Sequence, residues 1–297
     1  MPDTVMQDLR VVPSGAGLGA DIQGTDLARL DDVAFARIDA AWRDHLVLRV
    51  RGQTLDDVQL MAFSARFGQL DKVPIRAAGA PITSDPRLDI DPRAREYVTV
   101  ISNVKIDGKA IGNLGNYESL WHTDMSYNPE PPTASVLYAI EVPASGGNTG
   151  FTNMYRAYET LPDALRARVE GAICIHDASR NSVGELRRGF TEVSDPRQTV
   201  GARHPIVRTH PVTGRKALFL GRRRNAYIIG LEPADSEALL DQLWAHATQS
   251  GLTWTQVWKP GDLIIWDNRC TMHRRDEFDD TACRIMHRTQ ICGSKPY

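Results

Sequence analysis

The strongest constraint on the fold is a series of short β-rich segments that begins near residue 120 and continues to the C-terminus. These segments are rich in Val, Ile, Leu, Tyr and Trp, as is typical of strands. The turn sequences PVTG at 211–214 and KPGD at 259–262 each predict a hairpin between the segments on either side. The predicted strands cover residues 133–142, 204–210, 216–220, 252–258, 263–267 and 284–292.

Apolar residues at helical spacing predict several helices among and before these strands. For the second of them we expect Thr54 as the N-cap, Asp57 as its capping-box partner and Gly68 at the end. Short strands are expected within residues 1–30 and at 47–50. The predicted helices cover residues 31–45, 54–68, 161–169 and 232–249.

Together these elements predict a mainly β fold, a sandwich or barrel with helices packed outside. No internal repeat or linker divides the chain, so we expect one domain over residues 1–297. Residues 74–97 hold four prolines and no periodic pattern, and a Gly/Asn-rich run follows at 108–116. Long irregular loops of this kind are often lids, and we expect lid loops within residues 74–116.

Composition excludes several classes of protein. With 35 basic and 37 acidic residues, the net charge of −2 gives no bulk attraction for nucleic acid. No apolar stretch is long enough to cross a membrane. The four cysteines lie far apart and the N-terminus has no apolar signal segment, so we expect a cytoplasmic protein with reduced thiols. Its partner should be a small molecule, and we expect a homo-oligomer.

One histidine carries a metal-ligand pattern. In the segment 121–124 (WHTD), His122 is followed two positions later by Asp124, and residues i and i+2 of an extended chain face the same side. Two histidines and one carboxylate form the facial triad of non-haem Fe(II) oxygenases. The candidate for the third ligand is His273, which follows the second predicted hairpin by a short turn.

Two arginines on the last predicted strand indicate an anion site. Arg284 and Arg288 are four residues apart, so both project to one face, while Ile285 and His287 project to the other. Guanidinium groups aimed into a β-barrel are unfavourable unless each meets an anion, and a small dicarboxylate matches the pair.

These residues, in this order, resemble the Fe(II)/2-oxoglutarate dioxygenases of the taurine dioxygenase and 2,4-dichlorophenoxyacetate dioxygenase (TauD/TfdA) family. Arg284 and Arg288 stand eleven and fifteen residues after His273. The resemblance spans residues 17–293. Its further motifs are GADIQGTDL at 19–27, RFG at 66–68, GGNT at 146–149, WDNR at 266–269 and MHR at 286–288.

The resemblance implies a fold, a reaction and a set of roles. The fold is the double-stranded β-helix, a cupin-like jelly roll, and the reaction consumes 2-oxoglutarate and O2 at Fe(II). Arg284 and Thr149 match the residues that bind the distal carboxylate of 2-oxoglutarate, and Arg288 matches the one that binds an anionic primary substrate. The residues that match the iron ligands are His122, Asp124 and His273.

The expected substrate is a small anionic organic acid, with an aryloxyalkanoate-like carboxylate favoured. Taurine-type enzymes hold the amine with a histidine before the metal motif, but none lies between His45 and His122. The segment ISNVKIDGK at 101–109 instead resembles the phenoxyalkanoate members. Hydroxylation beside an ether oxygen would release a phenol or alcohol. The expected substrate contacts are Glu118, Met125 and Arg288.

Other functions stay open from the sequence. A sulfonate or an alkyl sulfate could replace the carboxylate, and a jelly-roll binding protein could keep the fold without catalysis. A zinc hydrolase could use the same ligands, although Thr149 and the arginine pair would then have no purpose.

Overall fold

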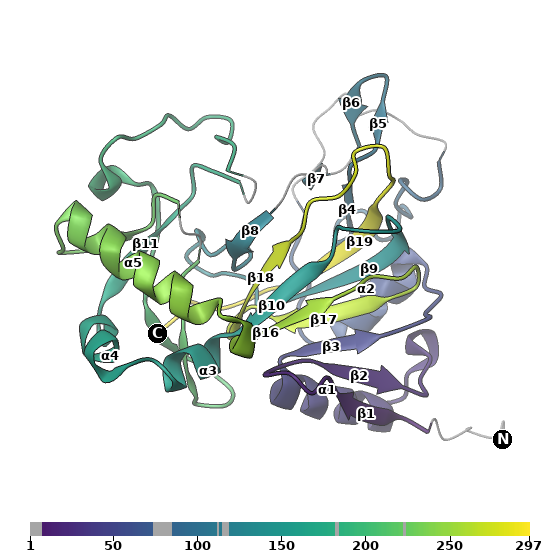
Figure 1. The fold of residues 1–297 in the computed structure, drawn as a ribbon. Helices are drawn as coiled ribbons and strands as arrows, with labels where there is room; N and C mark the ends of the chain where they lie inside the picture. Colours follow the sequence, from purple (N-terminus) through teal and green to yellow (C-terminus); the bar gives the residue numbers. More distant parts are fainter. Residues whose placement is uncertain (1–7, 74–84, 112, 115–118, 182–183, 222–223) are drawn as a thin grey trace.

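Two sheets form the framework of the protein (Figure 1). The computed structural model describes residues 8–73, 85–111, 113–114, 119–181, 184–221 and 224–297. Within them, the larger sheet has the order β1 (Arg10–Pro13), β2 (Ala20–Gln23), β3 (Val47–Val50), β17 (Leu263–Asp267), β9 (Ala134–Glu141), β19 (Ile285–Ile291), β4 (Thr99–Ser102), β7 (Asn113–Leu114). The smaller sheet has the order β16 (Thr253–Gln256), β10 (Thr149–Asn153), β18 (Thr271–Arg275), β8 (Ser119–His122).

Both faces of the larger sheet are buried, and the side chains of its central strands alternate between them. On β17, Ile264 and Trp266 join the core that faces the smaller sheet, where Trp266 packs 5.6 Å from Phe151 of β10. Leu263 and Ile265 face a second core on the other side. Burial on both faces explains why residues 263–266 of this strand are all apolar, and the stacked sheets confirm the expected jelly roll.

Two helices, α1 (Asp32–His45) and α2 (Asp57–Ala65), cover the outer face of the larger sheet. The sequence predicted both helices, but Thr54 is not the N-cap of α2. Asp56 accepts a hydrogen bond from the backbone of Gln59, whose side chain bonds back to the Asp56 backbone N–H. This complete capping box starts the helix two residues later than predicted.

Of the remaining elements, β5 and β6 lie above β4 of the larger sheet, whereas most lie beside the smaller sheet (Figure 1). There α5 packs Leu239, Leu240 and Leu243 into the core shared with the sheets. The predicted hairpin at 211–214 is confirmed by the pairing of two of these strands, β13 and β14. The elements are α3 (Met154–Glu159), α4 (Asp163–Val169), α5 (Pro233–Ala247), β5 (Lys105–Ile106), β6 (Lys109–Ala110), β11 (Ile173–Asp177), β12 (Gly201–Pro205), β13 (Val207–Thr209), β14 (Lys216–Leu218), β15 (Tyr227–Ile228) and three short 3-10 helices at Leu27–Arg29, Pro196–Gln198 and Ser250–Leu252.

The second predicted hairpin is wrong. β16 pairs with β10, whereas β17 pairs with β3 and β9, so the KPGD turn carries the chain from one sheet to the other. The turn is held by neighbouring loops and strands, because Gly261 N–H donates to Ala139 O and Gln53 N–H donates to Gly261 O. A local turn signal cannot distinguish a crossing between sheets from a hairpin.

Residues 99–102, which lie within the segment 74–116 expected to hold lid loops, form β4 and pair with β19 inside the larger sheet. The lid expectation for residues 74–84, 112 and 115–116 lies outside the described residues. The predicted strand at 204–210 divides into β12 and β13, which belong to different sheets.

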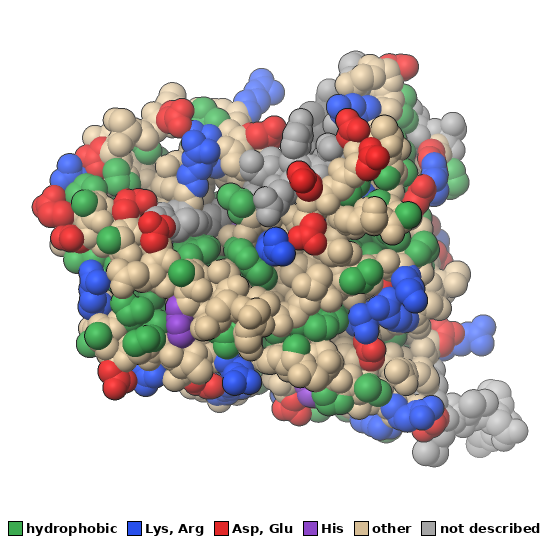
Figure 2. Space-filling model, in the orientation of Figure 1, with side chains coloured by type: hydrophobic (Ala, Val, Ile, Leu, Met, Phe, Trp, Pro, Cys, Tyr) green, Lys and Arg blue, Asp and Glu red, His purple; other side chains and the backbone are tan. Residues whose placement is uncertain are grey.

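The surface carries no strong field on the face drawn in Figure 2, where basic and acidic side chains are interspersed. Acidic residues gather over α5, on which Asp235, Glu237 and Asp241 are exposed. Among the helices in the described part of the chain, none has an apolar stretch that could span a membrane.

The capping box gives a test of the helix boundary. Asp56→Ala removes a side-chain acceptor from the first turn of α2 and should lower the free energy of unfolding by about 1 kcal/mol. Thr54→Ala is the matched control and should change stability little. Urea denaturation of both variants measures the difference, and an equal loss for the control would restore Thr54 as the cap.

Candidate functional site

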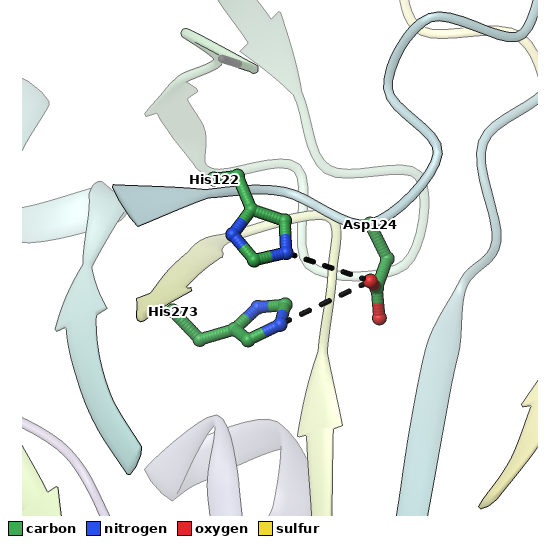
Figure 3. Close-up of side chains that lie close together, drawn as sticks. All are labelled: His122, Asp124 and His273. Carbon is green, nitrogen blue, oxygen red and sulfur yellow. Dashed lines mark ion pairs between the residues drawn. The ribbon is translucent and has the colours of Figure 1, made fainter. Parts of the chain in front are cut away.

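Strand pairing brings the three predicted metal ligands together. His122 ends β8 and lies directly opposite His273 of β18, so their rings lie 4.2 Å apart between centroids. Asp124 follows in the next turn, and its Oδ1 is 3.8 Å from His122 Nε2 and 3.9 Å from His273 Nε2. Figure 3 shows the three side chains pointing toward a common point. This is the geometry expected of a preformed three-ligand site, and all three side chains are largely buried.

Hydrogen bonds fix which ligand atoms face that point. His122 Nδ1 lies 2.7 Å from the carbonyl oxygen of Leu120. A carbonyl only accepts, so Nδ1 carries the proton and the Nε2 lone pair is left for a metal. Asp124 Oδ2 accepts a hydrogen bond of 2.7 Å from Ser135 Oγ, which leaves Oδ1 to face the imidazoles.

The charge of Asp124 is stabilised by its surroundings. Burial alone would raise the pKa of this carboxyl, but His273, Arg288, His122 and the Ser135 hydroxyl together lower it well below its usual range. The carboxylate is therefore ionised near neutral pH. Two imidazole nitrogens and one carboxylate oxygen on one face form a donor set that fits Fe(II) and leaves coordination positions open.

Two residues near this centre, Arg284 and Thr149, form a candidate anion site that we call the cationic pocket. Arg284 is buried, and its pKa falls to about 9 because of desolvation and the nearby charge of Arg275. Among the described residues, no carboxylate forms an ion pair with Arg284. Thr149 Oγ1 accepts a hydrogen bond of 2.9 Å from Trp258 Nε1, so the threonine hydroxyl proton is left to donate to another acceptor. The pocket is chemically suited to a carboxylate.

Arg288 is partly exposed and lies next to the metal centre. Its Nη1 is 3.7 Å from Asp124 Oδ1. On the opposite face of β19, His287 bonds to Asp57 of α2 at 2.6 Å. The strand therefore alternates as predicted, with the arginines on the inner face.

Of the two other predicted substrate contacts, the structure describes only Met125. Met125 directly follows Asp124 with a φ of 45°, and its carbonyl accepts a bond from Asn128 N–H, so it begins the turn after the metal motif. Glu118 lies outside the described residues.

Sequence reasoning missed three neighbours of the site: Ser135, Trp258 and Arg275. Ser135 and Trp258 act through hydrogen bonds to residues on other elements, and no local pattern marks them. Arg275 had a signal, because it stands two positions after His273 and so shares its face on a strand.

A second buried group of potential ligands comprises His210, Asp267 and Cys270. Arg269 forms two hydrogen bonds with the Asp267 carboxylate, at 2.8 and 2.6 Å, and His210 Nε2 lies 3.1 Å from the same group. Since the carboxylate is already satisfied, this network braces the turn of the WDNR motif and is not a metal site.

The fold and the site together define the class: a jelly-roll protein with a two-histidine, one-carboxylate metal centre and a buried arginine suited to a carboxylate. Residues 10–290 match the family described as "Taurine catabolism dioxygenase TauD, TfdA family". The chain belongs to this family and is a 2-oxoglutarate-dependent non-haem iron dioxygenase.

Individual members of the family are similar to this chain over most of its length. It is 34% identical to the (S)-phenoxypropionate/alpha-ketoglutarate-dioxygenase of Delftia acidovorans, covering 96% of this chain and 95% of that protein. It is 36% identical to the alpha-ketoglutarate-dependent 2,4-dichlorophenoxyacetate dioxygenase of Burkholderia sp. (strain RASC), covering 84% and 82%. The crystal structure of AAD-2 in complex with Mn(II) and N-oxalylglycine is similar with a TM-score of 0.74 and 31% identity, covering 97% and 98%.

The hydrogen bond from Ser135 to Asp124 yields a prediction about metal binding. Ser135→Ala should weaken Fe(II) binding by about 10- to 100-fold, because the carboxylate loses the group that orients it. Anaerobic Fe(II) titration measures the affinity. The control is Ser64→Ala, which removes another buried hydroxyl, one that bonds Leu60 O and Thr289 Oγ1 away from the site. Unchanged iron affinity in Ser135→Ala would show that the hydroxyl does not orient the ligand.

Proposed function

We propose that this dioxygenase hydroxylates a small anionic organic acid, with an aryloxyalkanoate-like carboxylate favoured. The observation that carries the proposal is the position of Arg288, whose guanidinium lies 3.7 Å from the carboxylate of the metal centre. A substrate whose anionic end meets Arg288 would present a nearby carbon to the metal.

Each residue has a role in this proposal. His122, Asp124 and His273 would hold Fe(II), and Arg284 with the Thr149 hydroxyl would bind the distal carboxylate of 2-oxoglutarate. When bound, Fe(II) with 2-oxoglutarate and O2 supplies an oxidant that inserts one oxygen atom, while the oxo acid becomes succinate and CO2. The buried surroundings of the three ligands keep bulk water away.

The choice of an aryloxyalkanoate is supported by the relatives, two of which are named for phenoxypropionate and 2,4-dichlorophenoxyacetate. Hydroxylation of the carbon that bears the ether oxygen gives a hemiacetal or hemiketal. Its carbon–oxygen ether bond breaks as the new hydroxyl proton moves to the departing oxygen. The products are a phenol or alcohol and an oxo acid.

Four further expectations belong to the same proposal: one domain over residues 1–297, lid loops within 74–116, a cytoplasmic location and a homo-oligomeric state. The four cysteines form no disulfide, which supports a reducing compartment. Met125 and Glu118 stay predicted substrate contacts.

A substrate screen tests the reaction. Aryloxyalkanoates, other carboxylates, sulfonates and sulfate esters are each incubated with the Fe(II)-loaded protein, 2-oxoglutarate and O2, and succinate is measured. We expect substrate-dependent succinate with an aryloxyalkanoate, and its loss in His122→Ala. The largest succinate yield from a sulfonate or sulfate ester would reassign the substrate, and zinc in the anaerobically purified protein without any turnover would favour the hydrolytic alternative.

Substitutions of Arg284 and Arg288 should change the KM of different substrates. Arg284→Ala should raise the KM for 2-oxoglutarate by about 100-fold or more, because it leaves the distal carboxylate without its charged partner. Arg288→Ala should mainly raise the KM for the primary substrate. Steady-state kinetics with each substrate varied in turn gives both values. Exchanged phenotypes would reverse the two assignments.

A further inference from the structure

Arg275 faces the same region as the predicted site residues, and the proposed function gives it no role. In the pairing of β10 with β18, Arg275 lies directly opposite Thr149, and His273 lies directly opposite Phe151. Residues opposite and two apart share one face of a sheet. Arg275 and Thr149 therefore project to the same inner face as His273, although the side chain of Arg275 ends in a charge and is only 6% exposed.

Arg284 reaches the same region from the other sheet. The space beside Gly147 is bounded by the aliphatic stem of Arg284 and the ring of Phe278, which would lie 3.4 and 3.3 Å from a Cβ at that glycine. The ring of Phe278 in turn lies 5.5 Å from the guanidinium carbon of Arg275. Two guanidinium groups thus converge near Thr149, one from β18 and one from the residue before β19.

Two like charges in a buried region repel each other and lose hydration. Burial, and after it the nearby charge of Arg275, lowers the pKa of Arg284. A carboxylate between the two groups would reverse both effects, because it supplies the opposite charge and several hydrogen-bond acceptors.

We propose that Arg275 is a second arginine for the distal carboxylate of 2-oxoglutarate, which it would hold together with Arg284 and the Thr149 hydroxyl. This assignment rests on the proposed function of the pocket. It makes Arg275 a residue that determines selectivity for 2-oxo diacids over 2-oxo monoacids, since its contribution exists only when the ligand carries a distal carboxylate.

Equilibrium binding without turnover tests the assignment. The Fe(II)-loaded protein is titrated anaerobically with 2-oxoglutarate and with 2-oxopentanoate, which has the same carbon chain without the distal carboxylate. The visible absorption of the chelated 2-oxo acid gives each Kd. Arg275→Gln should weaken 2-oxoglutarate by about 10- to 100-fold and change 2-oxopentanoate by less than about twofold. Arg275→Lys, which keeps the charge without the planar fork, should show a smaller loss confined to 2-oxoglutarate.

A structural role would give a different pattern. If Arg275 only supports the fold, both ligands should weaken together, and that result or unchanged 2-oxoglutarate binding would overturn the proposal. Arg208→Gln is the matched control, because it removes a buried arginine that packs against Phe219 on another sheet and should leave both Kd values unchanged. If the Gln variant does not fold, the Kd values of Arg275→Lys for 2-oxoglutarate and 2-oxopentanoate test the proposal instead.

The same titrations separate this proposal from the function itself. Failure of the wild-type protein to bind 2-oxoglutarate would reject the function assigned to the pocket. Tight wild-type binding that Arg284→Gln abolishes and Arg275→Gln leaves intact would reject only the role of Arg275.

Discussion

The pairing of β8 with β18 is the constraint on which the candidate site depends. It places His122 opposite His273, and the extended chain then brings Asp124 to the same side. A shift of one residue would turn His273 to the other face of the sheet and remove one ligand. β10 secures the register from the other edge of β18, because Phe151 pairs with His273 and its ring packs 6.1 Å from the imidazole. The metal centre is thus a consequence of sheet geometry.

The polar groups around this centre fall into two kinds, a hydrogen-bonded carboxylate and buried arginines. The Asp124 carboxylate is held by Ser135, which also accepts hydrogen bonds from Asn268 and Gln290. Such a connected network fixes a ligand before any metal arrives. The cationic pocket has the opposite character, since Arg284 is buried beside another guanidinium. The first arrangement fixes a ligand side chain, whereas the second offers positive charge to an anionic ligand.

The sequence could predict features that depend on residues close together in the chain, but not contacts that depend on how the sheets stack. The spacing of residues in and beside one strand was enough to place His122 with Asp124 and Arg284 with Arg288. It could not show that Ser135 of β9 would meet Asp124, because that contact depends on how two sheets stack. The KPGD hairpin was wrongly predicted for the same reason. Its residues favour a reversal of the chain, but backbone hydrogen bonds to Ala139 and Gln53 hold the turn where the chain passes to the other sheet. Thr54 and Asp56 are both good capping residues, and only the second has Gln59 three positions later.

The two buried arginines come from different sheets, so a ligand bound by both would connect the sheets. Arg275 belongs to the smaller sheet, and Arg284 stands at the start of a strand in the larger one. A carboxylate held by both would link the two sheets at the end where a metal links β8, β18 and the following turn. Each ligand that binds only the folded state stabilises it, so a cosubstrate carboxylate held by both arginines would cross-link the two sheets. Two neighbouring buried arginines are therefore understandable in a protein whose working state contains a diacid.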